Sequence, residues 1–211
     1  PNTQNPKFQD PQLRSMARAA GDQGAWTAAE GLPDVYIAMG ETAENVAEIE
    51  GVSREATDEY AFRSQQRTGA AIERGFFERE ITPYPTASGA VVTADDCPRP
   101  TTELEKLASL APVFRPTGRV TAGNACPLND GAAAVVVMSD TKARALGITP
   151  LARIVSTGVT GLDPEIMGLG PVGASQQALA RAGMTIDDID LVEINEAFAA
   201  QVIPSAGALG I

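Results

Sequence analysis

Asn195 is the residue whose type and position point most directly to chemistry. It follows the apolar run 191–194 and precedes the helical pattern of residues 196–202, so a strand is expected to end and a helix to begin there. In open α/β sheets, ligands gather at such junctions, where helix N-termini offer free N–H groups. The Asn195 amide can cap the helix, or it can fix a water molecule or a substrate carbonyl, and the residues alone leave both roles open.

Cys126 lies in a segment of small residues, 120–131, which reads VTAGNACPLNDG. Small side chains such as Ala122 let another group approach the backbone closely, although a tight connection between two regions would use the same residues. A cysteine becomes a nucleophile when its thiol loses its proton. Nothing basic lies near Cys126 in the sequence, so we expect an inert, buried thiol.

Three other patterns carry less information. Arg99, on a proline-rich loop, is a candidate phosphate-binding residue. The run 168–173 has the glycine spacing of a dinucleotide-binding loop, but a long loop separates it from the preceding expected strand, which argues against that function. An acidic cluster at 187–190 lacks the glycine and the terminal glutamate of a calcium loop, so we expect a solvated turn.

The 211 residues include no histidine and carry a net charge of −11. The lack of histidine excludes His-based zinc sites, Ser/His and Cys/His pairs and the usual neutral-pH base from this chain. The negative charge argues against nucleic-acid binding. No apolar run reaches about 18 residues, so no membrane span is expected.

The two cysteines, Cys97 and Cys126, are expected to be free thiols in a cytoplasmic protein, because a lone disulfide is weak evidence of secretion. The N-terminus has no basic region followed by an apolar stretch, so it does not predict a signal peptide. The chain begins at Pro1 without an initiator Met and stops just after a helical pattern, which suggests a fragment of something longer.

Helices are expected where capping residues and glycines bound an apolar periodicity. The expected helices span 42–50, 53–74 with Ser53 as the N-cap, 104–110, 139–146, 174–182 and a last one from 196. Residues 81–92 are expected to form a hairpin around Ser88 and Gly89. Residues 1–40, with four prolines and several glycines, are expected to be irregular.

Three short segments are expected to be strands: the continuous apolar run 132–138, and residues 151–157 and 191–194. They alternate with helices over residues 130–211, which predicts an α/β layer structure in that part of the chain. The first 120 residues look instead like an elaborated insertion without a regular sheet.

Five ordered motifs resemble those of thiolases, the acyl-CoA acetyltransferases that make or cleave a carbon–carbon bond β to a thioester. The motifs are residues 39–47, Ser53-Arg54-Glu55 with Asp58, and residues 121–131, 167–171 and 195–201. The resemblance covers nearly the whole chain. It also replaces the dinucleotide interpretation of residues 168–173, because the family has a Met-Gly-x-Gly-Pro turn there.

The resemblance implies an α/β fold of two similar halves packed as α-β-α-β-α layers, with a large loop domain inserted in the first half. Residues 1–128 would be most of that loop domain. Residues 129–149 would complete the N-terminal half, and residues 150–211 would begin the C-terminal half.

The resemblance further implies a ping-pong reaction. A cysteine takes the acyl group, a histidine of a Gly-His-Pro motif activates it, and a second cysteine moves the proton; all three would lie outside this chain. Asn195 would be the catalytic residue present, holding a water of the oxyanion hole. The substrate- and CoA-binding residues would be Met39, Arg99, Phe114, Ala122, Cys126, Met167, Ala197 and Phe198.

The implied substrate is coenzyme A or an acyl-CoA, with no covalently bound cofactor and no metal, in lipid metabolism such as fatty acid β-oxidation. The implied assembly is a homo-oligomer, a dimer or tetramer. Ala38 stands where biosynthetic members often carry His, which favours a 3-ketoacyl-CoA thiolase. Two alternatives stay open: a non-catalytic thiolase-like protein that binds CoA or lipid, and a purely structural fragment. The chain alone is expected to be inactive.

Overall fold

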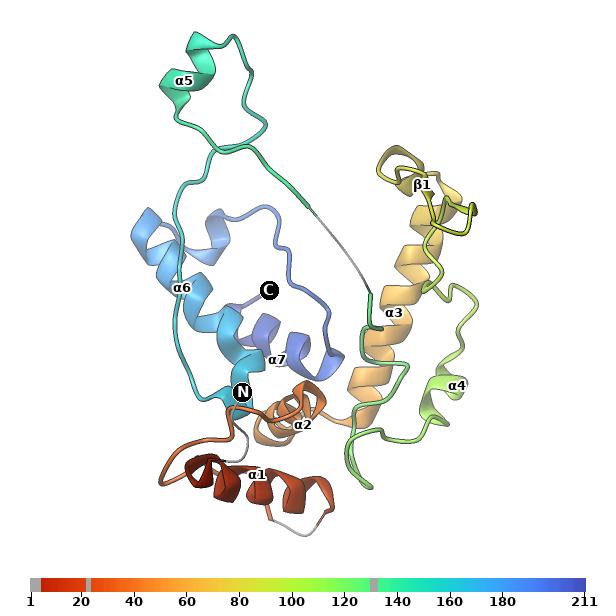
Figure 1. The fold of residues 1–211 in the computed structure, drawn as a ribbon, viewed down its shortest axis with the longest axis vertical. Helices are drawn as coiled ribbons and strands as arrows, with labels where there is room; N and C mark the ends of the chain where they lie inside the picture. The colour runs from red at the N-terminus through yellow and green to blue at the C-terminus, as the bar shows by residue number, and fades with distance from the viewer. Residues whose placement is uncertain (1–4, 22–23, 130–132) are drawn as a thin grey trace.

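Helix α2, Met39–Ile49, lies at the centre of the fold, and residues 40–47 are all buried. The computed structural model describes residues 5–21, 24–129 and 133–211. In Figure 1, α1 (Pro6–Ala19) lies beside α2 at one end, α3 (Arg54–Glu73) rises along one side and α6 (Gly170–Ala182) lies on the other, with α7 (Ala199–Leu209) between α6 and α3. A helix buried on every side is stabilised by the elements packed around it.

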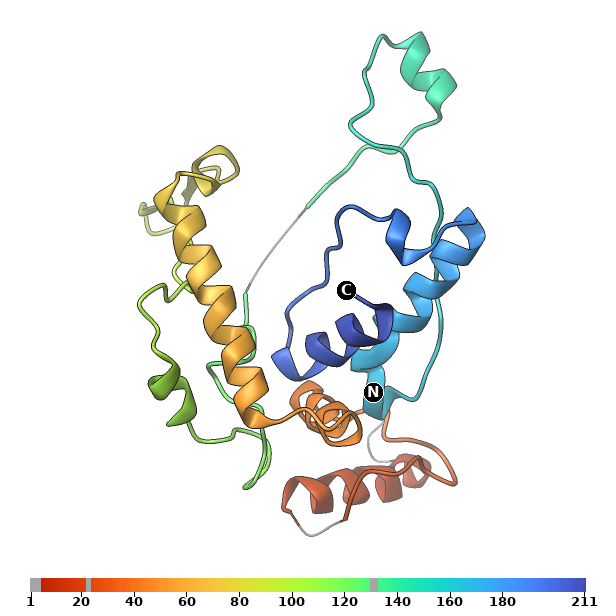
Figure 2. The ribbon, with the colours of Figure 1, turned by 180° about the vertical axis from the view of Figure 1, so that it is seen from behind.

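Shorter elements complete the described chain. The short helices are α4 (Leu104–Ala108) and α5 (Asp140–Ala145), and three 3₁₀ turns are η1 (Phe77–Arg79), η2 (Pro164–Leu169) and η3 (Ile186–Asp188). Seen from behind in Figure 2, α5 stands away from the other helices at the end of two long extended segments. None of the helices described is long and apolar enough to cross a membrane.

The prediction for α3 is confirmed. Ser53 caps this helix, since its hydroxyl oxygen accepts the Ala56 amide at 3.1 Å, and Glu55 places a negative charge in the first turn. Gly75, with φ of 70°, adopts the left-handed conformation that follows the helix end. The expected hairpin is also present, with β1 (Tyr84–Pro85) antiparallel to β2 (Val91–Val92).

The prediction that residues 1–40 are irregular is wrong, because residues 6–19 form α1. Asn5 caps this helix by accepting the Lys7 amide at 3.1 Å. Pro6 occupies the first turn, where its missing N–H would have had no partner in the helix. Proline disfavours a helix interior, whereas at a helix start it favours a helix.

The three predicted strands are not formed. Residues 133–138, 151–157 and 191–194 are extended, but none pairs in a ladder with any residue that the structure describes; Ala132 lies outside the described residues. Val135 and Val136 are each 85% exposed, and Leu151 is fully exposed. A strand needs a neighbour to satisfy its backbone groups, and in the described part of the chain the hairpin β1–β2 is the sheet that has one.

Helix α7 begins three residues later than predicted, at Ala199 in place of Glu196. Its N-cap position is Phe198, so Asn195 does not cap the helix and that alternative is wrong. Residues 195–198 therefore form a short extended connection, and the apolar residues that suggested an immediate helix are used for packing instead. Phe198 packs against the buried cluster Ala43, Ala47, Val52, Val120 and Ala200.

Candidate functional site

Two of the sequence motifs meet through their backbones. The amide of Cys126 donates to the carbonyl of Ala197 at 2.9 Å, and the amide of Ala199 donates to the carbonyl of Asn124 at 3.0 Å. These bonds flank an isolated antiparallel bridge between Ala125 and Phe198. The segment that carries Cys126 and the connection that carries Asn195 are thus held in one fixed register.

Asn124 fixes the turn that precedes Cys126. Its side-chain oxygen accepts the amide of Thr121 at 2.8 Å, and its side-chain nitrogen donates to the carbonyl of Arg119 at 2.9 Å and to Asp58 of α3 at 2.9 Å. Asn124 is buried. A buried amide with its donors and acceptor satisfied holds a loop in one conformation, so the turn containing Ala122 is attached rigidly to α3.

Asn195 and Cys126 line the same pocket. Its volume is about 230 Å³, and residues from α3, from the 123–127 segment and from the 195–199 connection surround it. We call it the Asn195 pocket, and its lining comprises Tyr60, Ala61, Ser64, Gln65, Gly123, Asn124, Ala125, Cys126, Pro127, Asn195, Glu196 and Ala199. The Asn195 side chain is exposed, and it makes no hydrogen bond to any residue in the described ranges. Its amide is thus available to a ligand.

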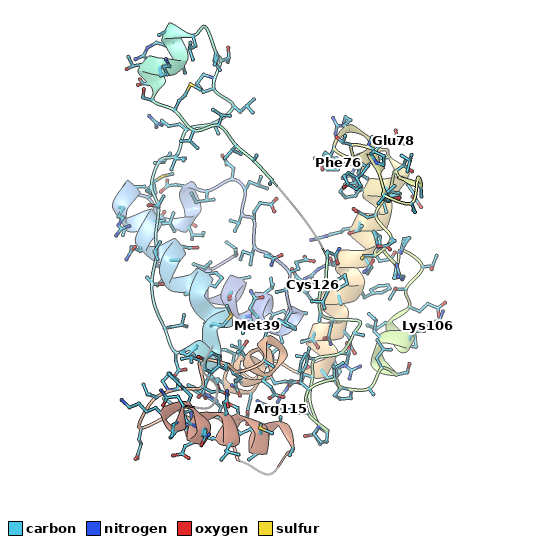
Figure 3. All side chains as sticks on the ribbon, in the orientation of Figure 1. Met39, Phe76, Glu78, Lys106, Arg115 and Cys126 are labelled. Carbon is cyan, nitrogen blue, oxygen red and sulfur yellow. The ribbon has the colours of Figure 1, made fainter. Side chains whose placement is uncertain are left out.

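Cys126 is exposed, which corrects the expectation of a buried thiol. Its amide is tied to Ala197, which holds the residue at the rim of the Asn195 pocket, and Figure 3 places it on the segment beside α3. The pocket lining within the described residues contains no Lys or Arg that would activate the thiol. Both cysteines are free, as predicted. The geometry suits Cys126 to a contact role.

Phe114 and Met39 are brought together at the start of α2. A Cβ built on Gly40 would lie 2.0 Å from the Phe114 ring, so the ring rests directly on the helix backbone next to Met39. Met39 itself is half exposed. A glycine is therefore required at position 40, and its small size lets Phe114 pack against the core while Met39 faces outward.

Met167 lies in η2, which is held from two directions. The Gly168 carbonyl accepts the hydroxyl of Ser205 in α7 at 3.1 Å, and a Cβ on Gly168 would lie 2.8 Å from Gln201. On the other side, the fully buried carboxylate of Glu165 accepts the Asp34 amide and the Trp26 indole N–H, both at 2.8 Å. Met167, about half exposed, projects from this fixed turn.

Arg99 is attached to α3 but its guanidinium faces its own loop. The Arg99 amide donates to Gln65, which lines the Asn195 pocket, at 2.7 Å. The guanidinium donates to the carbonyls of Asp96 and, at 3.0 Å, Pro98. Arg99 is therefore exposed beside the pocket, and one of its guanidinium nitrogens bonds to carbonyls of its own loop.

The charged groups around α2 belong to the scaffold. Arg115 donates to Glu41 at 2.9 Å and to Asn45 at 2.6 Å, and Arg18 of α1 donates to Glu48 at 2.7 Å. Figure 3 shows Arg115 between α1 and α2. Burial raises the pKa of the Glu41 carboxyl in spite of the Arg115 contact, and burial together with the nearby Arg115 charge lowers the pKa of Arg18.

Several residues that shape the site were not singled out from the sequence. Glu44 is fully buried and accepts the amides of Arg119 and Val120, which precede the Thr121 turn. Tyr60 and Ser64 of α3 reach the Asn195 pocket and hydrogen-bond Glu196. A carboxylate between Ala43 and Ala47 of an otherwise apolar helix face was a usable signal for Glu44. The partners of Glu196 lie too far away in sequence to be recognised.

The acidic cluster near residue 188 is a turn, as expected. Asp188 and Thr185 form a capping box around η3, in which Asp188 accepts the Thr185 amide at 2.8 Å. These backbone and hydroxyl bonds to Thr185 lower the pKa of the Asp188 carboxyl.

Comparison with known families and proteins agrees with this arrangement. Residues 3–141 match the model of the thiolase N-terminal domain, and residues 148–211 match that of the thiolase C-terminal domain. An acetyl-CoA acetyltransferase of Syntrophomonas wolfei is 51% identical over 185 residues, covering 85% of this chain and 46% of that protein. A 3-ketoacyl-CoA thiolase of Pseudoalteromonas translucida is 51% identical over 178 residues, covering 82% and 46%.

The structure is similar to that of human mitochondrial 3-ketoacyl-CoA thiolase, with a TM-score of 0.78 and 46% identity over 84% of this chain and 45% of that one. A structure of the same human enzyme in complex with CoA matches equally well. The fold class is therefore the α/β thiolase fold, of which this chain forms a part, since it spans about half the length of the relatives it matches. Together, the two domain matches and these relatives establish that the chain belongs to the thiolase family.

Proposed function

We propose that the protein to which this chain belongs is an acyl-CoA acetyltransferase that acts on 3-ketoacyl-CoA and CoA. The observation that carries the proposal is the free Asn195 amide in a pocket shared with Cys126, at a backbone junction held by the Ala125–Phe198 bridge. Fixed dipoles aimed at developing charge accelerate acyl transfer. In this proposal Asn195 holds a water molecule that donates to the thioester oxygen as negative charge builds on it.

The other predicted residues supply binding surface in this proposal. Cys126, Ala197 and Phe198 lie at the junction, and Ala122 lies in the turn that precedes it, so these residues suit contact with the pantetheine arm. The other predicted binding residues lie on neighbouring elements. Met39 and Phe114 lie at the start of α2, and Met167 lies in η2, which packs against α2 and α7. Arg99 would turn its guanidinium from its own loop toward a CoA phosphate.

The nucleophilic cysteine, the activating histidine and the proton-transferring cysteine are proposed to come from outside these residues. The absence of histidine and of a basic residue in the pocket lining described above supports that assignment.

The exposed runs at 133–138, 151–157 and 191–194 are proposed to be strands of the complete protein, paired with parts of it outside this chain. The proposed domain boundaries follow the thiolase fold. The loop domain comprises residues 1–128, the end of the N-terminal half comprises residues 129–149, and the start of the C-terminal half comprises residues 150–211.

Catalytic turnover is the direct test. The complete protein, expressed from its full reading frame, is expected to cleave acetoacetyl-CoA or a longer 3-ketoacyl-CoA in a CoA-dependent manner. Incubation with acetyl-CoA alone should leave an acyl group on the protein, as a ping-pong mechanism requires. The 211-residue chain is the control and is expected to be inactive.

The absence of histidine here favours one competing candidate, a non-catalytic thiolase-like protein that binds CoA or lipid. Saturable CoA binding by the complete protein without turnover or acylation would support that candidate and contradict ours. We also propose that the complete protein is a homodimer or homotetramer, which size-exclusion chromatography with light scattering tests on the same sample. The proposed location is the cytoplasm, which is tested by measuring thiolase activity in the cytoplasmic fraction.

A further inference from the structure

Glu196, the neighbour of Asn195, is held by two side chains of α3. The Tyr60 hydroxyl donates to one carboxylate oxygen of Glu196 at 2.8 Å, and the Ser64 hydroxyl donates to the other at 2.7 Å. Tyr60 and Ser64 are one helical turn apart, so both point from the same face of α3. Each carboxylate oxygen thus has its own donor, in charge-assisted bonds of the stronger kind.

The Asn195 connection has few other fixed points. It lies outside α7, and the Asn195 side chain makes no hydrogen bond within the described ranges. The backbone is tied two residues later, where Ala197 accepts the Cys126 amide. Because Glu196 lies between Asn195 and that tie, its side-chain bonds to α3 restrict the orientation of the Asn195 peptide.

Glu196 also lines two pockets. It lines the Asn195 pocket and a second pocket of about 310 Å³, and Tyr60 and Ser64 line both. Arg63 and Arg67 line the second pocket, and the Arg63 guanidinium lies 5.3 Å from the centre of the Tyr60 ring. The cation–π contact between Arg63 and Tyr60 helps fix the Tyr60 ring.

We propose that Tyr60, Ser64 and Glu196 form a clamp that positions the Asn195 amide in its pocket. The proposal rests on the function proposed above, since it assigns these three residues an effect on the transition state through Asn195. They are positioning residues, and none of them is required to touch the substrate.

The clamp is built to stay closed at neutral pH. Burial, and then the hydrogen bond to Glu196, raise the pKa of the Tyr60 hydroxyl to about 12. Tyr60 therefore keeps its proton and remains a donor under ordinary conditions. A phenylalanine would keep the ring and the Arg63 contact while removing only the donor.

Kinetics of the complete protein tests the clamp. Tyr60→Phe combined with Ser64→Ala is expected to lower kcat about 10- to 100-fold, the cost of displacing a catalytic group by a fraction of an ångström to an ångström, with KM for CoA changed less than about twofold. Ser64→Thr, which keeps a hydroxyl, should retain most of the rate. Tyr84→Phe removes a hydroxyl from an exposed tyrosine in β1 and is the matched control, expected to be silent.

The mechanism requires that the effect pass through Asn195. In an Asn195→Ala background, the clamp substitutions should lower kcat by less than about twofold more, because the group they position is already gone. Full additivity of the losses, or a wild-type kcat in the clamp double variant, would overturn the proposal.

Hydrogen exchange separates failure of the clamp from failure of the proposed function. The backbone amides of Cys126 and Ala199, which bond across the junction to Ala197 and Asn124, should exchange at least about tenfold faster in the clamp double variant than in the wild type, whether or not the protein turns over. Unchanged exchange refutes the clamp. A wild-type protein that lacks turnover refutes the proposed function, and accelerated exchange of the Cys126 and Ala199 amides in the clamp double variant would then still support the clamp as a structural device.

Discussion

The carboxylate of Glu44 accepts the backbone amide of Val120 at 2.8 Å, and both residues are completely buried. The same carboxylate accepts the Arg119 amide, at 2.8 Å to one oxygen and 3.0 Å to the other. A side chain of the central helix α2 thus accepts the backbone amides immediately before the turn that carries Ala122 and Asn124. The shape of the site depends on a side chain that never reaches the Asn195 pocket.

Glu44→Gln is expected to destabilise the complete protein by about 1–3 kcal/mol. The glutamine NH2 would replace the oxygen that lies 3.0 Å from the Arg119 amide and would set one donor against another, and the remaining acceptor would lose its charge. Urea unfolding followed by fluorescence measures the change. Glu50→Gln is the matched control: Glu50 lies in the same region, is exposed, and should change stability by less than about 0.5 kcal/mol. Equal effects of the two substitutions would mean that the buried hydrogen bonds of Glu44 do not contribute to the free energy of unfolding.

Gly40→Ala is expected to destabilise the protein by about 1–3 kcal/mol, since the new methyl would overlap the Phe114 ring. Adding Phe114→Leu should recover part of the loss because it removes the overlapping atoms. Gly31→Ala, at a glycine with open space around it, serves as the control in the same thermal or urea measurement. No loss in Gly40→Ala would show that Phe114 does not rest on α2.

Glu165 should make stability depend on pH in the acidic range. Burial raises the pKa of its carboxyl, but hydrogen bonds from the Asp34 amide, the Trp26 indole and Arg14 outweigh burial and hold the pKa below its ordinary value of 4.5. As the pH falls below about 4.5, the unfolded chain takes up the proton first, so the stabilisation present at higher pH is lost. The stability difference between wild type and Glu165→Gln should shrink over that range.

Glu41 provides the opposite sign in the same experiment. Its pKa is raised by burial, so the folded protein takes up the proton first as the pH falls toward 4.5 from above. Wild type should therefore gain stability relative to Glu41→Gln over that window. Parallel pH profiles for the two variants would contradict both assignments.

The apolar runs near Val136 and Leu191 test the proposed strands. In the complete protein their backbone amides should exchange slowly with deuterium, because a buried sheet protects its hydrogen-bonded N–H groups. Exchange measured by mass spectrometry on peptides covering 133–138 and 191–194 checks this. Fast exchange, comparable to that of the exposed hairpin at Val91, would mean that these runs stay unpaired.

Local signals in the sequence predicted local structure well. Ser53 and Ser139 marked the starts of α3 and α5, and the glycines after α3, α5 and α6 marked the ends of those helices, because caps and left-handed turns are decided within a few residues. Helix α6 begins at Gly170, four residues before the expected start. Pro6 misled the prediction for α1 because proline acts differently at a helix start. The runs at 133–138 and 151–157 have strand composition, but composition supplies no neighbour to pair with.

The site was only partly predictable for a related reason. The thiolase resemblance identified Asn195 and Cys126, which the structure places in one pocket. It did not identify Tyr60 and Ser64, whose contact with Glu196 joins positions far apart in the sequence. Contacts of that kind follow from tertiary packing, which no short pattern encodes.

Steady-state thiolysis by Asn195→Ala in the complete protein tests the central claim most directly. Loss of one oxyanion-hole element is expected to lower kcat about 10²- to 10³-fold, with a much smaller change in KM, because the interaction strengthens only as charge develops in the transition state. Cys126→Ser, a change at the rim of the same pocket, should keep kcat within about tenfold. A wild-type kcat in Asn195→Ala would contradict the account.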